Sequence, residues 1–329
     1  MNSAQDTLSS LAQCAWRIRR LAVRMGEVQG QGYVGQALGY ADVLAVAYGH
    51  AMNFRADDPE WTGRDRFLLS HGHYAIAHYA ALIEAGIVPE SELETYGSDD
   101  SRLPMSGMAT YTPGMEISGG SLGQGLPIAV GIALGLRHQK SPAFVYNSMS
   151  DGELDEGSVW EAAMSAAHHG LGNLICMVDI NNQQADGPSS KVLGFEPLAD
   201  KWRAFGWHVQ RVNGNDLSYD IAVIAGTLPR TSGPASLFID IIGLPFTPLS
   251  FAGVARRTAA TSAALSRTWP AANARQGSTR STSSPPARHG MPMPSGDVLL
   301  LVVGERDQLP RRQHHPQDRE RFGLPGHVD

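Results

Sequence analysis

The chain has 329 residues, of which 42% are hydrophobic, enough for one large α/β domain or two small ones with a sizeable core. Its net charge of −6 excludes the overall basic surface that nucleic-acid binding needs, so we expect no nucleic-acid partner. Met1–Arg20 lacks the pattern of a signal peptide, and the apolar run Leu126–Leu136 is about half of the roughly 20 residues that span a bilayer. We therefore expect a soluble, cytoplasmic protein without a membrane partner.

The first third of the chain predicts helices separated by glycine-rich or apolar segments. Asp6–Met25 has apolar residues at helical spacing and predicts an amphipathic helix. Gly26–Gly39 predicts a glycine-rich loop, and Ala41–Met52 a buried helix. The short apolar run Arg66–Leu69 leads to Ser-His-Gly-His and then to a helix that ends near Ala85.

The remainder of the first 243 residues predicts alternating strands and helices. A second glycine-rich loop, Ser118–Gly125, opens an apolar helix that ends near Arg137. The expected strands are Ala143–Met149, Leu174–Ile180, Trp207–Val212 and Ala235–Ile242, and the expected helices are Glu156–His169, Pro197–Phe205 and Leu217–Gly226. Continuous apolar strands alternating with helices indicate an α/β fold, a parallel sheet with helices on both faces.

Polar residues follow two of these strands, at the edge where parallel sheets bind ligands. Asp151 follows the first and Asn181 the second, with one helix between them. The two loops should therefore meet at one edge of the sheet, on neighbouring strands. A carboxylate and an amide oxygen suit Mg²⁺, which takes few protein ligands and fills its shell with phosphate and water. Gly152 lets backbone approach a diphosphate, and the helix from Glu156 directs N–H groups toward it.

His73 is the histidine with the clearest functional position. It follows a glycine and opens a helix beyond a strand, where it can donate to a phosphate or assist proton transfer. The alternative is that one of His71, His73 and His78 only packs or caps.

Motifs that follow one another along the chain in the right order resemble those of the transketolase family. In chain order they are Asp65–His73, Pro113–Gly125, Ser150–Met164 with Leu174–Ile180 and Asn181–Gly187, and Leu198–Trp207. The resemblance extends from about Leu8 to Ile242 and covers only the first domain of a two-domain family. It implies the thiamine diphosphate-binding fold and, within it, the diphosphate-binding domain. The chain resembles the N-terminal subunit of a split transketolase.

The resemblance also implies roles for individual residues. It implies that the side chains of Asp151 and Asn181 and the backbone carbonyl of Gln183 bind Mg²⁺. Gly152 and Glu153 are implied to line the diphosphate, and Gly120 and Leu122 to contact the aminopyrimidine side of the cofactor. His73 is implied to lie between diphosphate and substrate. Glu156 is implied to join a chain of acidic residues that links paired active sites. The cofactors implied are thiamine diphosphate and Mg²⁺.

Two substrate positions depart from the family pattern. Tyr33 and Ser106 stand where the family has histidines, so imidazole is replaced by hydroxyl at both. Ser150 replaces the first glycine of the metal motif, a milder change. The cofactor site therefore looks retained and the sugar-recognition site altered, which predicts ketol transfer with an unusual donor or acceptor.

The composition changes after residue 243. Residues 1–243 carry 15 basic and 26 acidic side chains, whereas 244–329 carry 11 and 6. We interpret 1–243 as the diphosphate- and Mg²⁺-binding domain and 244–329 as an atypical Arg/Pro/Ser-rich tail with little packed structure. A frameshift explains the tail best. A native disordered tail and a recruited arm are the alternatives.

The resemblance implies a partner, because the family's catalytic glutamate belongs to the second domain. We expect a C-terminal, pyrimidine-binding partner, an α2β2 assembly, a sugar substrate, and no activity by this chain on its own. The alternatives are a non-catalytic or degraded cofactor-binding subunit, and a deoxyxylulose-phosphate synthase-like or E1-like enzyme. A dinucleotide-binding domain is a third, but no G-x-G-x-x-G follows a first strand.

Overall fold

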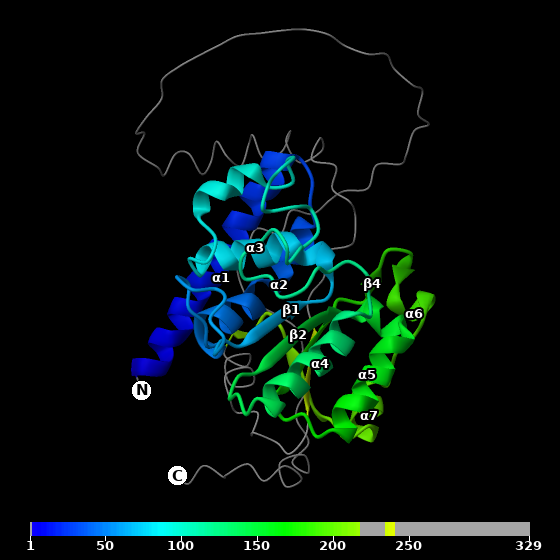
Figure 1. The fold of residues 1–329 in the computed structure, drawn as a ribbon. Helices are drawn as coiled ribbons and strands as arrows, with labels where there is room; N and C mark the ends of the chain where they lie inside the picture. The colour runs from blue at the N-terminus through cyan, green and yellow to red at the C-terminus, as the bar shows by residue number, and fades with distance from the viewer. Residues whose placement is uncertain (1, 218–233, 241–329) are drawn as a thin grey trace, which may run out of the picture. The chain divides into compact units, whose positions relative to one another are not determined.

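The computed structural model describes residues 2–217 and 234–240 (Figure 1). The predicted helix Leu217–Gly226 falls almost wholly outside these residues, and the predicted tail after residue 243 lies entirely outside them. None of the helices in the described part of the chain combines the length and apolar character that a membrane span requires.

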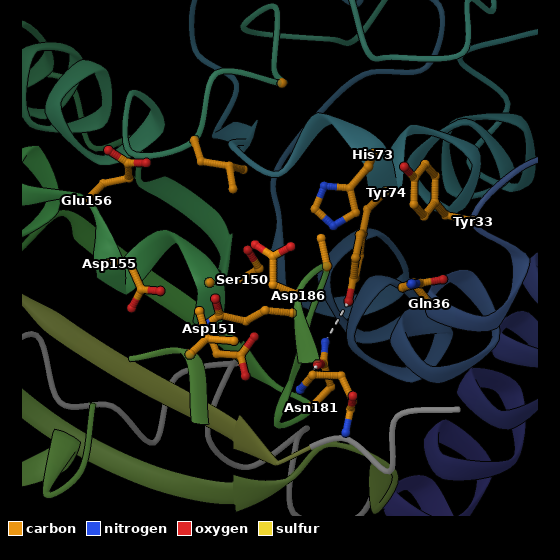
Figure 2. A pocket seen from close by; sticks show the side chains of 17 residues that line it. Tyr33, Gln36, His73, Tyr74, Ser150, Asp151, Asp155, Glu156, Asn181 and Asp186 are labelled. Atoms are coloured by element: carbon orange, nitrogen blue, oxygen red, sulfur yellow. Dashed lines mark hydrogen bonds between the residues drawn. The ribbon is translucent and has the colours of Figure 1, made fainter. Parts of the chain in front are cut away.

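A five-stranded parallel sheet organises the described chain. Its strands, in spatial order, are β1 (Arg66–Leu69), β2 (Val145–Ser150), β3 (Leu174–Ile180), β7 (Ala235–Asp240) and β6 (His208–Asn213). All neighbouring pairs are parallel. The predicted fold class is therefore confirmed, and so is the pairing of β2 with β3. Their carboxyl ends lie side by side, with Asp151 after one and Asn181 after the other (Figure 2).

Helices and short turns connect the strands. The α-helices are α1 (Asn2–Gln29), α2 (Val34–Val46), α3 (Ala75–Glu84), α4 (Gly125–His138), α5 (Gly157–His168), α6 (Ser189–Val192) and α7 (Leu198–Ala204). A π turn, η1 (Ala47–Ala51), extends α2, and the 3₁₀ turns are η2 (Gly72–Tyr74), η3 (Glu90–Thr95) and η4 (Asp151–Asp155). A two-stranded antiparallel hairpin pairs β4 (Gln183–Gln184) with β5 (Gly187–Pro188).

The predicted glycine-rich loop Gly26–Gly39 is much shorter than expected. Helix α1 runs through Gln29 and α2 starts at Val34. Gly30 and Gly32 have positive φ angles of 71° and 139°, which glycine adopts readily, so the chain reverses within this short connection.

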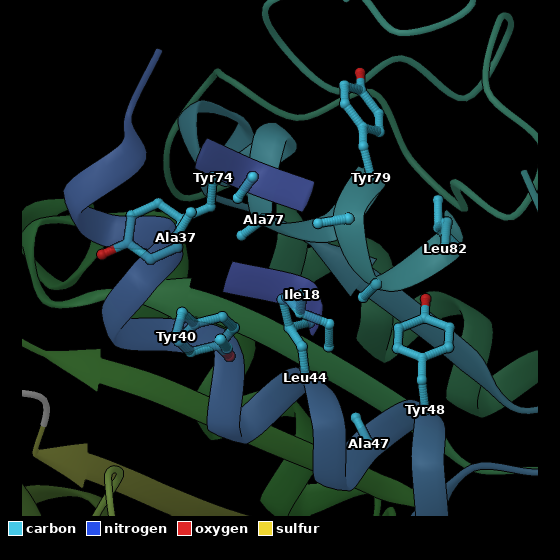
Figure 3. Close-up of a cluster of buried hydrophobic side chains, with 14 of the residues drawn as sticks. Ile18, Ala37, Tyr40, Leu44, Ala47, Tyr48, Tyr74, Ala77, Tyr79 and Leu82 are labelled. Atoms are coloured by element: carbon cyan, nitrogen blue, oxygen red, sulfur yellow. The ribbon is translucent and has the colours of Figure 1, made fainter. Parts of the chain in front are cut away.

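Two hydrophobic clusters cover the two faces of the sheet. One joins the sheet to α1, α2 and α3, and includes Ile18, Leu44 and Tyr79 (Figure 3). The other joins it to α4, α5 and α7, and includes Trp202. Successive strand residues alternate between the clusters, with Phe67 and Leu69 in the first and Leu68 in the second, as the two-residue period of a strand requires. Burial on both faces explains why the central strand β3 is apolar at all positions but one.

Candidate functional site

A cavity of about 530 Å³ opens at the carboxyl edge of the sheet (Figure 2). Its walls come from the residues that follow β1, β2 and β3, from the second glycine-rich loop and from the start of α2. The lining residues are Tyr33, Gln36, His73, Tyr74, Gly120, Leu122, Ser150, Asp151, Gly152, Asp155, Glu156, Asn181, Gln183, Gln184, Ala185, Asp186 and Val192. The structure thus brings together all the site residues predicted from sequence except Glu153 and Ser106.

Asp151 lies directly after β2 and is only 1% exposed. Its Oδ2 accepts hydrogen bonds from the backbone N–H of Asn182 (3.0 Å) and from the Ser189 hydroxyl (2.9 Å). Burial raises the pKa of Asp151 to about 6, and these hydrogen bonds oppose the shift. A buried carboxylate of this kind is stabilised by a nearby cation.

Asn181 is the first residue after β3 and is half-buried. Its Oδ1 accepts from the backbone N–H of Gln183 at 2.9 Å, and its Nδ2 donates to the Tyr74 hydroxyl at 3.2 Å (Figure 2). The next residue, Asn182, has a φ of 59°, and this left-handed residue turns the chain from β3 into the short hairpin. The hairpin places Gln183 in the cavity wall beside Asn181.

Asp179 lies beneath this edge of the cavity, next to the last residue of β3, and is 1% exposed. The Tyr74 hydroxyl donates to its Oδ2 at 2.5 Å. Burial, together with the negative charge of Asp151, raises the pKa of Asp179 to about 7. Sequence reasoning missed both Tyr74 and Asp179, because a tyrosine next to a histidine and an acid inside an apolar strand carry no signal of their own.

His73 is the one of the three neighbouring histidines that lines the cavity. It lies in η2, and its ring meets the Tyr33 ring edge-on with centroids 5.2 Å apart. Burial lowers its pKa to about 4, so the imidazole is neutral near pH 7. His71 and His78 are fully buried, where they contact Ser148 Oγ (2.7 Å) and the Tyr48 hydroxyl (2.5 Å).

The second glycine-rich loop forms the roof of the cavity through Gly120 and Leu122. Gly119 packs so closely on Gly72 that a Cβ at either position would lie within 3 Å of backbone atoms of the other. Ser106 lies behind this loop, and its hydroxyl donates to the Gly119 carbonyl at 3.2 Å. It therefore supports the loop and does not line the cavity in this structure.

Glu153 and Glu156 take different places although they are three residues apart. Glu153 is 0% exposed, and its carboxylate accepts from the Ser70 hydroxyl, the Gly123 N–H (2.9 Å) and the Ser150 N–H (3.1 Å). Through these hydrogen bonds it connects the ends of β1 and β2 to the second glycine-rich loop, and it does not line the cavity itself. Glu156 is exposed, lines the cavity and precedes α5.

Besides Tyr74, seven lining residues were not named as site residues from sequence. They are Gln36, Ser150, Asp155, Gln184, Ala185, Asp186 and Val192. Asp155 belongs to the same motif as Asp151, and its place in that motif could have indicated that it lies near the cavity. Gln184 and Ala185 belong to the hairpin, which periodicity does not reveal because its strands are two residues long.

The donor set fits a hard divalent cation. Asp151 offers a carboxylate, Asn181 an amide oxygen and Gln183 a backbone carbonyl, at neighbouring strand ends. In the described part of the chain there is no cluster of three His, Cys, Asp or Glu side chains suited to a metal. This agrees with a set that contains a single carboxylate, since amide and carbonyl oxygens complete it.

The chain is a parallel α/β domain with a cavity beyond the strand ends, where domains of this class bind their ligands. Residues 10–235 match the family model of the transketolase, thiamine diphosphate binding domain. The chain therefore belongs to the transketolase family, whose members are transferases, as one of its thiamine diphosphate-binding domains.

Curated relatives agree with this assignment. The chain is 72% identical over 208 residues to the transketolase family protein y4mO of Sinorhizobium fredii, covering 63% of this chain and 75% of that protein. It is 38% identical to the 6-deoxy-6-sulfo-D-fructose transketolase subunit SqwG of a Clostridium species, covering 68% and 82%. It is also 38% identical to an apulose-4-phosphate transketolase subunit of Actinobacillus succinogenes, covering 70% and 84%.

Solved transketolases share the fold over a smaller part of their length. The transketolase of Leishmania mexicana superposes with a TM-score of 0.68 and 31% identity, over 70% of this chain and 36% of that one. The Campylobacter jejuni enzyme gives 0.67 and 27%, over 72% and 38%. The chain thus spans little more than a third of the solved transketolases it matches.

Proposed function

We propose that this chain binds thiamine diphosphate through Mg²⁺, which Asp151 and Asn181 hold with their side chains and Gln183 with its carbonyl. The observation that carries the proposal is the meeting of these three oxygen donors in one cavity, at the ends of β2 and β3. Among the described residues that line the cavity, none is lysine or arginine. A metal ion and N–H donors would therefore offset the charge of a diphosphate.

The residues after β2 form the diphosphate end of the proposed site. Gly152 lines the cavity, and a Cβ added there would meet only Gln184, at 3.6 Å or more. Glu153, predicted to line the diphosphate, would act from behind by holding the surrounding loops in place. At the other end, Gly120 and Leu122 would contact the aminopyrimidine side of the cofactor.

The proposed reaction is ketol transfer, the movement of a two-carbon unit between sugar or sugar-like substrates. When bound, the cofactor supplies the carbon nucleophile and the electron sink for carbon–carbon cleavage. His73 is neutral and lines the cavity, so it could donate or accept a hydrogen bond and exchange a proton with a substrate hydroxyl. Glu156 would link paired active sites through a chain of acidic groups.

A separate subunit would complete the enzyme. The chain covers 75–84% of three curated relatives, two of which are named as transketolase subunits, but only 36% of a solved transketolase. This difference in coverage supports a split enzyme in which residues 1–243 form the diphosphate-binding domain. A C-terminal, pyrimidine-binding partner and an α2β2 assembly are part of the proposal.

The substrate is proposed to be an unusual sugar. Tyr33 lines the cavity beside His73, and Ser106 supports the roof, where the family pattern has histidines at both positions. Two relatives are named for apulose 4-phosphate and 6-deoxy-6-sulfo-D-fructose, which supports a substrate outside the ordinary pentose phosphates. Transfer assays with the partner present test this point. Full activity with xylulose 5-phosphate would contradict it.

Isothermal titration of thiamine diphosphate with MgCl₂ into the full chain tests the binding step. We expect binding by the wild type and none by Asp151→Ala, with Asp200→Ala as an exposed acidic control that binds normally. Absence of binding by the wild type, with or without the partner, would identify a degraded remnant. Binding without activity in the assembled complex would identify a non-catalytic subunit.

A further inference from the structure

A polar relay of three side chains ends at the proposed metal ligand Asn181. The Tyr74 hydroxyl donates to Asp179 Oδ2 at 2.5 Å and accepts from Asn181 Nδ2 at 3.2 Å. A phenol has a single proton to donate. Because Asp179 takes that proton, the Tyr74 oxygen can only accept from Asn181. The amide must therefore turn its NH₂ group toward Tyr74.

The opposite end of the amide of Asn181, a residue that lines the cavity, is its oxygen. Asn181 Oδ1 accepts from the Gln183 N–H at 2.9 Å and keeps a second lone pair. The two ends of an amide have nearly the same shape, so packing alone does not choose between them. Mg²⁺ does distinguish them, since it binds oxygen and is repelled by an NH₂ group.

We propose that Tyr74 and Asp179 are positioning residues that orient the Asn181 amide with its oxygen toward the metal. The inference rests on the proposed metal site and adds two residues to which the sequence motifs assigned no role. Tyr74 comes from η2, after β1, whereas Asp179 and Asn181 come from the end of β3. The relay thus couples the loop that carries His73 to the metal site.

The tyrosine ring is held firmly enough to act in this way. Tyr74 is 1% exposed, and its ring packs edge-on against those of Tyr40 (5.6 Å between centroids) and His71 (4.0 Å). Burial raises the pKa of Tyr74 well above 10, with the charge of Asp179 adding to the effect, so the phenol keeps its proton. An outer residue that fixes a ligand's orientation typically changes metal affinity by about 10–100-fold when it is removed.

The test is a double-mutant cycle read by calorimetry. MgCl₂ is titrated into the full chain with saturating thiamine diphosphate, for wild type, Tyr74→Phe, Asn181→Asp and the double variant. Tyr74→Phe should raise the Kd for Mg²⁺ about tenfold. In the Asn181→Asp background both ends of the side chain are oxygen, so orientation no longer matters and Tyr74→Phe should change the Kd less than about twofold. Tyr79→Phe is the matched control, since it removes another buried hydroxyl, bonded to the Pro104 carbonyl, at a residue that does not line the cavity.

A second cycle serves if Asn181→Asp abolishes binding. Asp179→Leu removes the acceptor of the phenol proton, which can then turn toward Asn181, so it should weaken Mg²⁺ binding as much as Tyr74→Phe, with no further loss in the double variant. Equal losses of affinity in both backgrounds, or additive losses in the second cycle, would mean that the Tyr74 hydroxyl does not act by orienting the Asn181 amide and would overturn the inference. No heat from the wild type would overturn the metal site itself and the inference with it. Normal wild-type binding that Tyr74→Phe leaves unchanged would overturn the inference alone.

Discussion

The backbone N–H of Asn182 donates to Oδ2 of Asp151 at 3.0 Å, which ties the loop after β3 to the residue that follows β2. The two strand ends are therefore joined by the protein itself. The bond by itself lowers the pKa of Asp151. Burial outweighs this effect and that of the other hydrogen bonds that the carboxylate accepts, so the pKa is raised to about 6. Because burial disfavours the ionised form of Asp151, two measurable properties of the protein should depend on pH.

The first is the stability of the cofactor-free protein. Burial raises the pKa of Asp151 from 3.8 to about 6, so between these values the folded state keeps a proton that the unfolded state has lost. The unfolding free energy contributed by Asp151 therefore falls as pH rises from about 4 to about 6 and is flat above that. The buried histidines, whose pKa values are lowered, act in the opposite sense. Comparing wild type with Asp151→Asn by urea denaturation removes the contribution of the histidines, because both proteins contain them. The wild type should lose stability relative to the variant between pH 4.5 and 7.5. A constant difference would contradict the prediction.

The second is the affinity for Mg²⁺. Below pH 6 a proton competes with the metal for Asp151, so the Kd for Mg²⁺ should rise by roughly tenfold per pH unit there and level off above pH 7. Calorimetry with thiamine diphosphate in two buffers of different ionisation enthalpy should also detect proton release on binding near pH 6. An affinity that does not change between pH 5 and 7 would show that Asp151 is not a ligand.

Glu153 should matter for stability more than its hidden position suggests. Its carboxylate accepts from Ser70, Gly123 and Ser150, and an amide in its place would turn an NH₂ group toward at least one of these donors. We expect Glu153→Gln to lower the free energy of unfolding by about 1–3 kcal/mol, measured by urea denaturation. Glu161→Gln on the exposed surface of α5 is the control and should change it by less than about 0.5 kcal/mol. Equal changes in the free energy of unfolding for the two substitutions would show that the hydrogen bonds of Glu153 do not stabilise the fold.

Two glycines near α4 should respond to alanine in opposite directions. Gly123 has a φ of 79°, and a Cβ there would lie 2.6 Å from that of Glu156, so Gly123→Ala should destabilise the fold by about 1–3 kcal/mol. Gly131 lies inside α4 with no atom within 4 Å of an added Cβ, so Gly131→Ala should stabilise it by about 0.5–1 kcal/mol. Chemical denaturation of both variants checks the signs, and a loss of stability in Gly131→Ala would contradict the open environment of that position.

The sequence predicted β1, β2 and β3 well because these strands are buried on both faces. Leu174–Ile180 is a strand over its predicted bounds, and Asp151 and Asn181 meet as their places after neighbouring strands required. The glycine-rich segment Gly26–Gly39 was predicted poorly. Its second half forms the start of α2, since burial of Ala37 and Tyr40 against the neighbouring helices outweighs the helix-breaking tendency of its glycines (Figure 3).

Two features of the structure depend on distant contacts and left no local trace. β7 lies between β3 and β6 in the sheet, an order that is set by packing and that periodicity does not specify. The contact of Tyr74 with Asp179 joins residues 105 positions apart in the chain. Local patterns therefore indicated where the proposed metal ligands Asp151 and Asn181 lie, but not that Tyr74 and Asp179 contact each other beside them.

Tyr33 offers the most direct test of an altered substrate site. Its ring lies edge-on to His73, and it is 36% exposed in the cavity wall, so its hydroxyl can reach a substrate without contributing to the core. With the partner present, Tyr33→Phe should raise the KM for the sugar donor about tenfold, the loss of one hydrogen bond of about 1.4 kcal/mol, while the Kd for thiamine diphosphate stays unchanged. Tyr33→His should shift the preference toward ordinary pentose phosphates. Tyr111→Phe, at an exposed tyrosine outside this cavity, is the control. A change in cofactor affinity with an unchanged KM would place Tyr33 on the cofactor and not on the substrate.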